Sequence, residues 1–232
     1  MADYVLVHGA WHGAWCWKRV LPTLWQAGHR AFAVSLGGVG ERAHEAAETI
    51  GLARHIDDVC AVIDAEELQQ AVLVGHSYAG MVITGVADRL GDRLAHLVYL
   101  DAMLPRPHES WSSLAPPGMR DERRRLIARE GTLPPPNPTL YGLSGADAAW
   151  VSRRQTRHPG RPYDEPLGFD PATLQSLPRT YVSCTQPPLS SVDLSRARAR
   201  SEPGWNFIEL ATGHDPMISA APALAAILLR LG

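Results

Sequence analysis

Short apolar runs alternate with stretches of helical spacing over the first hundred residues of the chain. A run of about four to eight β-favouring residues that ends at glycine or at a polar residue is typical of a buried strand. The runs of this kind are "YVLVH" (4–8), "RAFAVSL" (30–36), "AVLVG" (71–75) and "LAHLVYLD" (94–101). Helical spacing occupies 15–27, 51–67 and 78–90, and in the second of these segments one face carries Leu52, Ile56, Val59 and Ile63.

The alternation pauses after Asp101. Residues 102–178 contain most of the 19 prolines and show no strand period, which predicts a cap of short helices and loops folded over the sheet edge. The alternation then resumes, with predicted strands at 180–184 and 206–210 and predicted helices at 190–201 and 216–231. Such alternation requires right-handed crossovers. We therefore predict one α/β domain over 1–232, with about six mostly parallel strands, helices on both faces and a cap insertion at about 102–178.

Composition narrows the range of partners. With 22 basic and 24 acidic residues the net charge is −2, which gives no general attraction to nucleic acid or to a membrane surface. Arginine runs at 123–125 and 196–200 alternate with apolar or acidic residues and are expected to be solvated helix faces. No apolar run reaches the roughly 18 residues of a membrane span, and no signal-peptide pattern opens the chain, so we expect a cytoplasmic protein.

Ser77 lies in "GHSYAG" (75–80), between a predicted strand and a predicted helix. A strained strand-to-helix turn with small neighbours raises a serine above the sheet edge and directs the N-terminus of the next helix towards it. Ala79 stands where this pattern usually has its second glycine, and alanine is still small enough for the turn. Ser77 is therefore the candidate nucleophile, and a tight turn that only needed glycine is the alternative.

His214 is the candidate base, because it follows the last predicted strand. The segment "VHGAWHGAWCW" (7–17) follows the first strand and predicts an oxyanion hole made by the backbone N–H groups of Ala10 and Tyr78. The remaining histidines are expected at the surface or on helices, at positions 29, 44, 55, 96, 108 and 158.

His8 and His12 belong to the oxyanion segment. We expect both to stabilise its turn by hydrogen bonds. No carboxylate lies near them in the sequence, so no metal site is predicted.

These motifs, together with "LVYLDAMLP" and "TGHDPM", resemble those of the α/β-hydrolase superfamily. More narrowly, the chain is similar to the group of plant methyl-salicylate esterases, plant hydroxynitrile lyases and their bacterial esterase relatives. The resemblance spans nearly the whole chain, is weakest in the cap, and implies an α/β-hydrolase fold. Cyanohydrin cleavage in this group relies on a hydroxyl residue and a lysine at positions that are Ala10 and Asp215 here. His76, before the serine, is as in the esterases, so the resemblance favours an esterase.

The acid of the triad is less clear from the sequence. In the plant enzymes it lies just after the penultimate strand, where this chain has "SCTQPPLSS" (183–191), without a carboxylate. Asp101, at the end of the fourth strand, keeps the order Ser77–Asp101–His214 and is the candidate. A strand-end aspartate that caps the first turn of the cap is its alternative role. Asp193 is the reserve candidate, and a site without an acid stays open.

The sequence therefore predicts a serine hydrolase that cleaves a small to medium apolar ester or lactone through an acyl-enzyme on Ser77, with no metal or organic cofactor. Trp11, Trp111 and Trp150 are expected to line an apolar substrate pocket. The expected partner is a small-molecule substrate, not nucleic acid or a membrane, and a homodimer stays open. Two alternatives remain: a cyclase, dehydratase or lyase on the same scaffold, or a small-molecule receptor.

Overall fold

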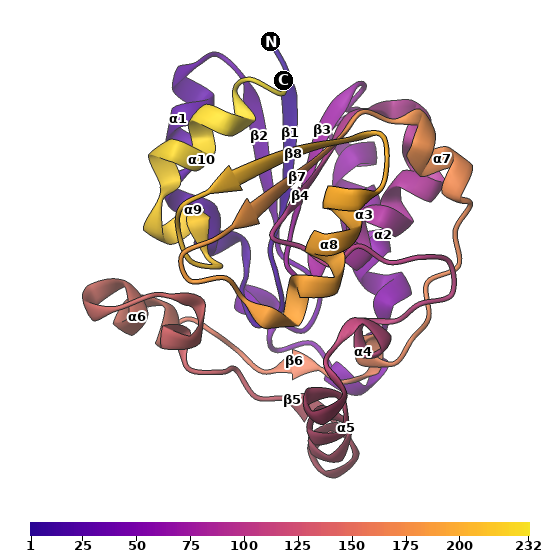
Figure 1. The fold of residues 1–232 in the computed structure, drawn as a ribbon, viewed down its shortest axis with the longest axis vertical. Helices are drawn as coiled ribbons and strands as arrows, with labels where there is room; N and C mark the ends of the chain where they lie inside the picture. The colour runs from indigo at the N-terminus through magenta and orange to yellow at the C-terminus, as the bar shows by residue number, and fades with distance from the viewer.

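A six-stranded sheet forms the centre of the computed structural model, which describes residues 1–232 (Figure 1). The strand order is β2-β1-β3-β4-β7-β8, and every neighbouring pair is parallel. The strands are β1 (Asp3–Val7), β2 (Arg30–Val34), β3 (Ala71–His76), β4 (Leu94–Leu100), β7 (Arg179–Cys184) and β8 (Trp205–Leu210). The predicted α/β-hydrolase sheet is confirmed.

Burial along the strands explains why the central ones appear in the sequence as continuous apolar runs. Every residue of β3 is buried, because helices cover both faces of a parallel sheet. The edge strand β8 instead has no fully buried residue and mixes half-buried with exposed positions. The sequence signal is therefore strongest for the strand that carries Ser77 at its end.

Helices pack on both faces of the sheet. α2 and α3 lie together on one side, and α1 and α10 lie on the other (Figure 1). The helices outside the cap are α1 (Leu21–Gln26), α2 (Leu52–Ala65), α3 (Ala79–Leu90), α8 (Asp193–Ser201), α9 (Pro216–Ser219) and α10 (Ala221–Leu228). None of them, and none in the cap, combines the length and the apolar character that a membrane span requires.

Two predicted helices are divided in the structure. The helix expected at 15–27 is a 3₁₀ turn over Ala14–Arg19 followed by α1, whose first turn holds Pro22. The single helix expected at 216–231 is interrupted at Ala220, where α9 ends and α10 begins. Proline cannot supply the N–H of a continuing helix and is accepted only in a first turn, so Pro222 forces a new start.

Residues 102–178 connect β4 to β7; residues 111–159 lie at the end of the molecule away from both termini, whereas residues 171–176 lie beside α3 (Figure 1). The elements of this cap are α4 (Trp111–Leu114), α5 (Pro117–Glu130), β5 (Thr132–Leu133), α6 (Gly145–Ser152), β6 (His158–Pro159) and α7 (Pro171–Ser176). The expectation of helices and loops alone is wrong, because β5 and β6 pair antiparallel. Each has only two residues, too few for a period to show.

The register of the central strands places the ends of β3 and β4 side by side. His76 pairs with Leu100, and Leu100 pairs with Val182 of β7. The residues that follow, Ser77 and Asp101, are therefore neighbours at the carboxyl edge of the sheet, where open α/β sheets bind their ligands.

Candidate active site

Ser77 occupies the turn between β3 and α3 in a left-handed conformation, with φ of 55°. Its N–H donates to the Leu100 carbonyl (3.2 Å), and its own carbonyl accepts from the Met103 N–H (2.9 Å). Non-glycine residues seldom adopt this conformation, and it persists where surrounding bonds hold it. Ser77 is half-buried in a stretch whose other residues are buried, so the turn keeps the hydroxyl accessible.

His214 is held by Asp101. The loop between β8 and α9 presents the imidazole, and its Nδ1 lies 2.7 Å from Asp101 Oδ2. Both side chains are buried, and Asp101, with φ of 41°, is a second left-handed residue at the sheet edge. A carboxylate in this place fixes the tautomer that leaves the other ring nitrogen free to act as a base.

The second oxygen of Asp101 binds the neighbouring strand. Oδ1 accepts from the Cys184 N–H (3.2 Å) and from Arg196 Nη2 (3.1 Å), while the Asp101 N–H donates to the Val182 carbonyl (2.7 Å). The side chain thus extends from the end of β4 to the end of β7. Because these strands are adjacent, an acid after β4 reaches the region that an acid after β7 would occupy.

Asp193, the reserve acid, does not reach His214. Its side chain is 62% exposed and pairs with Arg196. Arg196 in turn contacts Asp101 and donates to Ser183 Oγ (2.9 Å). The expectation that the run 196–200 is a solvated face is therefore wrong in part, since Arg196 points inward, and so does the buried Arg198, which binds Glu109.

The expected oxyanion donors lie on either side of the serine. Neither the Ala10 nor the Tyr78 N–H donates a hydrogen bond within the protein. Gly9 allows the segment after β1 to approach, because a Cβ at this position would lie 2.8 Å from Ser77 Cβ. Free amides beside the nucleophile are what an oxyanion hole requires.

Ser77 and His214 line one cavity of about 70 Å³ at the sheet edge. Its wall includes Trp11 and Trp111, whose ring centres lie 5.9 Å apart. Cap residues complete it, Tyr141 and Arg123 among them. This cavity joins the hydroxyl and the imidazole, which come from distant parts of the chain.

Trp150 does not belong to this wall. Its ring packs edge-on against Trp15 at 5.1 Å and lies beside Arg19 and Arg154. The expectation that it lines the pocket with Trp11 and Trp111 is corrected, because α6 places it on another side of the oxyanion segment.

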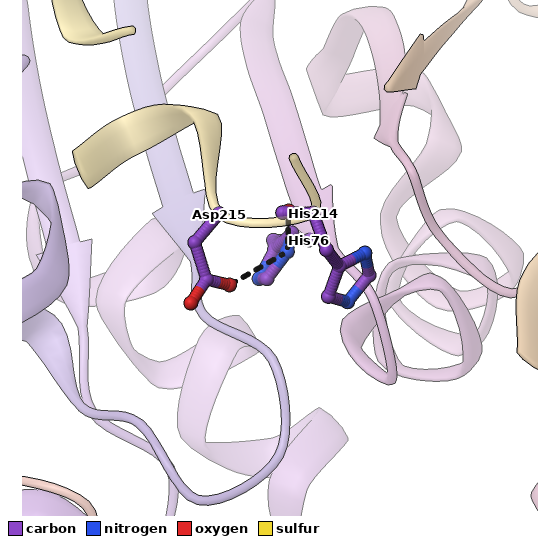
Figure 2. A group of neighbouring side chains, drawn as sticks. All are labelled: His76, His214 and Asp215. Atoms are coloured by element: carbon purple, nitrogen blue, oxygen red, sulfur yellow. Dashed lines mark hydrogen bonds and ion pairs between the residues drawn. The ribbon is translucent and has the colours of Figure 1, made fainter. Parts of the chain in front are cut away.

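A buried polar cluster that the sequence did not predict lies behind His214 (Figure 2). His76 Nε2 lies 2.8 Å from the His214 carbonyl oxygen and 3.6 Å from Asp215 Oδ1, while His12 Nε2 lies 3.4 Å from Asp215 Oδ2. The expectation that His12 has no carboxylate nearby is therefore wrong. His12 also meets the Ala10 carbonyl through Nδ1 (2.9 Å), as expected of a turn-stabilising residue.

The charges of this cluster follow from its pairing. Burial opposes charge on both partners, but their mutual attraction exceeds it, so the pKa of His12 is raised and that of Asp215 is lowered. Burial, followed by the neighbouring His214, holds the pKa of His76 well below its usual value. A neutral His76 therefore donates Nε2–H to the His214 carbonyl and ties His214 to the strand that carries Ser77.

His76, His214 and Asp215 could also offer ligand atoms to a metal, since these atoms lie within 4.8 Å of one another. One nitrogen of each ring already has a partner. Asp101 binds His214 Nδ1, and the His214 carbonyl binds His76 Nε2. The other nitrogen of each ring is left over: His76 Nδ1 has no hydrogen-bond partner, and His214 Nε2 is the nitrogen expected to act as the base.

Two further histidines expected at the surface or on helices contact the side chain of Tyr78 in the interior. His55 lies on α2, is buried, and its Nδ1 lies 2.9 Å from the Tyr78 hydroxyl. His158 is also buried, and its ring packs edge-on against Tyr78 at 4.9 Å. The surface expectation is wrong for His158, because β6 turns its side chain inward.

Comparison with known proteins agrees with the architecture. Residues 4–227 match the model of the alpha/beta hydrolase family, and the chain belongs to this family. It is 36% identical over the full length of both proteins to a carbendazim hydrolyzing esterase of a Nocardioides species. It is 29% identical to methylesterase 3 of Arabidopsis thaliana, over 98% of this chain and 94% of that protein.

Within the family the chain is a carboxylic ester hydrolase of the methylesterase and hydroxynitrile lyase group. Its fold is similar to that of an extracellular alpha/beta-hydrolase from a Paenibacillus species. That structure is described as sharing homology with tobacco salicylic acid binding protein 2. The TM-score is 0.87 at 23% identity, over 100% of this chain and 99% of the other.

Proposed function

We propose that the chain is a serine esterase that hydrolyses a small to medium carboxylic ester through an acyl-enzyme on Ser77. The observation that carries the proposal is the 2.7 Å contact between His214 and Asp101 at a cavity that Ser77 also lines. This arrangement contains a nucleophile, a base and a group that orients the base.

In the proposed acylation step, the Ser77 hydroxyl attacks the ester carbonyl and gives its proton to His214. The N–H groups of Ala10 and Tyr78 stabilise the negative charge on the carbonyl oxygen. Asp101 stabilises the imidazolium. His214 then protonates the departing alcohol, and the bond between the carbonyl carbon and the alcohol oxygen breaks.

Deacylation repeats these roles with water. His214 takes a proton from water, the resulting hydroxide attacks the acyl carbonyl, and the Ser77 oxygen leaves with a proton from His214. The acid product and free enzyme result. Apart from the ester and water, every group named in these steps belongs to the chain. Relatives named methylesterases make methyl esters the first substrate class to test.

The experiment compares wild type with Ser77→Ala on methyl and 4-nitrophenyl esters of short acids. We expect Ser77→Ala to lose on the order of 10⁴-fold or more in kcat/KM. Intact-mass measurement should detect an acyl adduct on the wild type and none on the variant. An adduct on a residue other than Ser77, or an active Ser77→Ala, would overturn the proposal.

A further inference from the structure

Arg123 of α5 lies in the wall of the cavity that contains Ser77 and His214. Its guanidinium carbon lies 5.5 Å from the ring centre of Trp11 and 5.2 Å from that of Trp111. A permanent positive charge therefore lies at the mouth of a site whose other walls are mostly apolar.

No carboxylate pairs with this charge. Two other arginines of α5 are bound within the protein. Arg124 pairs with Asp164. Arg120 donates to the backbone carbonyls of Ser112, Ser113 and Ala115. Arg123 is half-buried, and no acidic oxygen lies within 4.0 Å of it. Its surroundings supply the aromatic rings of Trp11, Trp111 and Tyr163, with the Tyr163 hydroxyl beside it.

Aromatic faces attract a guanidinium but leave its N–H groups without acceptors. A guanidinium has five donors in a plane and keeps its charge at every physiological pH. The rings of Trp11 and Trp111 hold the plane by cation–π attraction. What the group still lacks is a negatively charged partner, and a carboxylate matches its geometry with two parallel hydrogen bonds.

We propose that Arg123 determines specificity by binding a second, ionised carboxylate on the ester substrate. The preferred substrates are then hemiesters, in which one carboxyl group is esterified and the other is free. This inference rests on the proposed esterase function. It replaces the expectation of a purely apolar substrate, because the aromatic walls contact the carbon chain while Arg123 binds its charged end.

The test compares two substrates with the same leaving group, mono-4-nitrophenyl glutarate and 4-nitrophenyl pentanoate. Only the first carries a carboxylate. In Arg123→Gln we expect the ratio of kcat/KM for glutarate to that for pentanoate to fall about 10- to 100-fold, mainly through KM. The matched control is Arg125→Gln on the same helix, an exposed arginine outside the cavity, which should leave the ratio unchanged.

An Arg123→Gln variant that slows both substrates equally would overturn the role in specificity and leave a structural one. Calorimetric binding of the glutarate hemiester to Ser77→Ala, with and without Arg123→Gln, separates this inference from the esterase proposal. Arg123-dependent binding without turnover in the wild type would contradict the esterase proposal and support the carboxylate site. Turnover of the pentanoate ester, with no dependence of either substrate on Arg123, would support the esterase proposal and contradict the carboxylate site.

Discussion

Asp101→Asn changes the charge of the proposed triad acid while keeping its shape. Oδ1 accepts from the Cys184 N–H and from Arg196, so the amide oxygen of the variant must take that position. The amide NH₂ group then faces His214 Nδ1, where Oδ2 now lies 2.7 Å away. Two donors cannot bond to each other, so His214 must move its proton to the other nitrogen and lose its function as a base.

The size of the effect follows from this change of tautomer. In the serine-protease case of the same substitution, kcat falls by about 10⁴. A 10⁴-fold loss corresponds to about 5 kcal/mol of transition-state stabilisation. We expect a loss of similar order here, because Asp101 is the only acid in contact with His214 Nδ1. The fold should survive, since the amide oxygen keeps both donors of Oδ1.

The assay is initial-rate hydrolysis of 4-nitrophenyl acetate at pH 8, with Tm measured on the same preparations. Asp193→Asn is the matched control, because its carboxylate is exposed, pairs with Arg196 and does not contact His214. We expect that control to retain activity within about threefold. A folded Asp101→Asn with more than a tenth of wild-type kcat/KM would refute the assignment of the acid.

Three further predictions concern the support of the site. Gly80→Ala should lower Tm and cut kcat/KM at least tenfold, because its Cβ would lie 1.9 Å from a backbone oxygen of the loop after β4; Gly118→Ala, in open space, is the control. Asp215→Asn should lower the free energy of unfolding measured in urea. The loss should be smaller than the roughly 3–5 kcal/mol expected when one partner of a buried ion pair is removed, because His12 can release its proton. Unchanged stability would contradict the pairing of His12 with Asp215. Burial lowers the pKa of His55 to about 4, so between pH 6.5 and 4 the unfolded chain takes up a proton that the folded one does not. Stability should therefore fall as the pH is lowered through that window, by about 1.4 kcal/mol per unit from His55 alone, and the buried His8, His76 and His158, whose pKa values are also lowered, add to the fall. A flat urea midpoint between pH 7 and 5 would count against this.

Much of the sheet and part of the site could be predicted because their signals are local. Ser77 lies in a six-residue motif, and His214 follows a strand of visible period. Asp101 could be selected by its place at a strand end, although nothing local says that its side chain spans to β7. That contact depends on the order of strands in the sheet, which the sequence does not state directly.

The features that were missed depend on contacts between distant segments. His12 and Asp215 lie at opposite ends of the chain, and each has an unremarkable sequence neighbourhood. Arg123 and Arg196 belong to arginine-rich runs, in which composition cannot tell the inward residue from its solvated neighbours. Trp150 was misplaced for the opposite reason, since an aromatic residue in a cap suggests a pocket even where it packs elsewhere.

The small volume of the cavity has a consequence for the timing of turnover. Pockets that enclose a ligand usually measure about 300–1,000 Å³, far more than the 70 Å³ beside Ser77. Part of the wall comes from α5, which has no fully buried residue, although its Leu126 and Ile127 pack against the core. We therefore expect an ester larger than this cavity to displace part of the wall as it enters, and the frequency of that displacement would then limit the rate at which such esters are admitted.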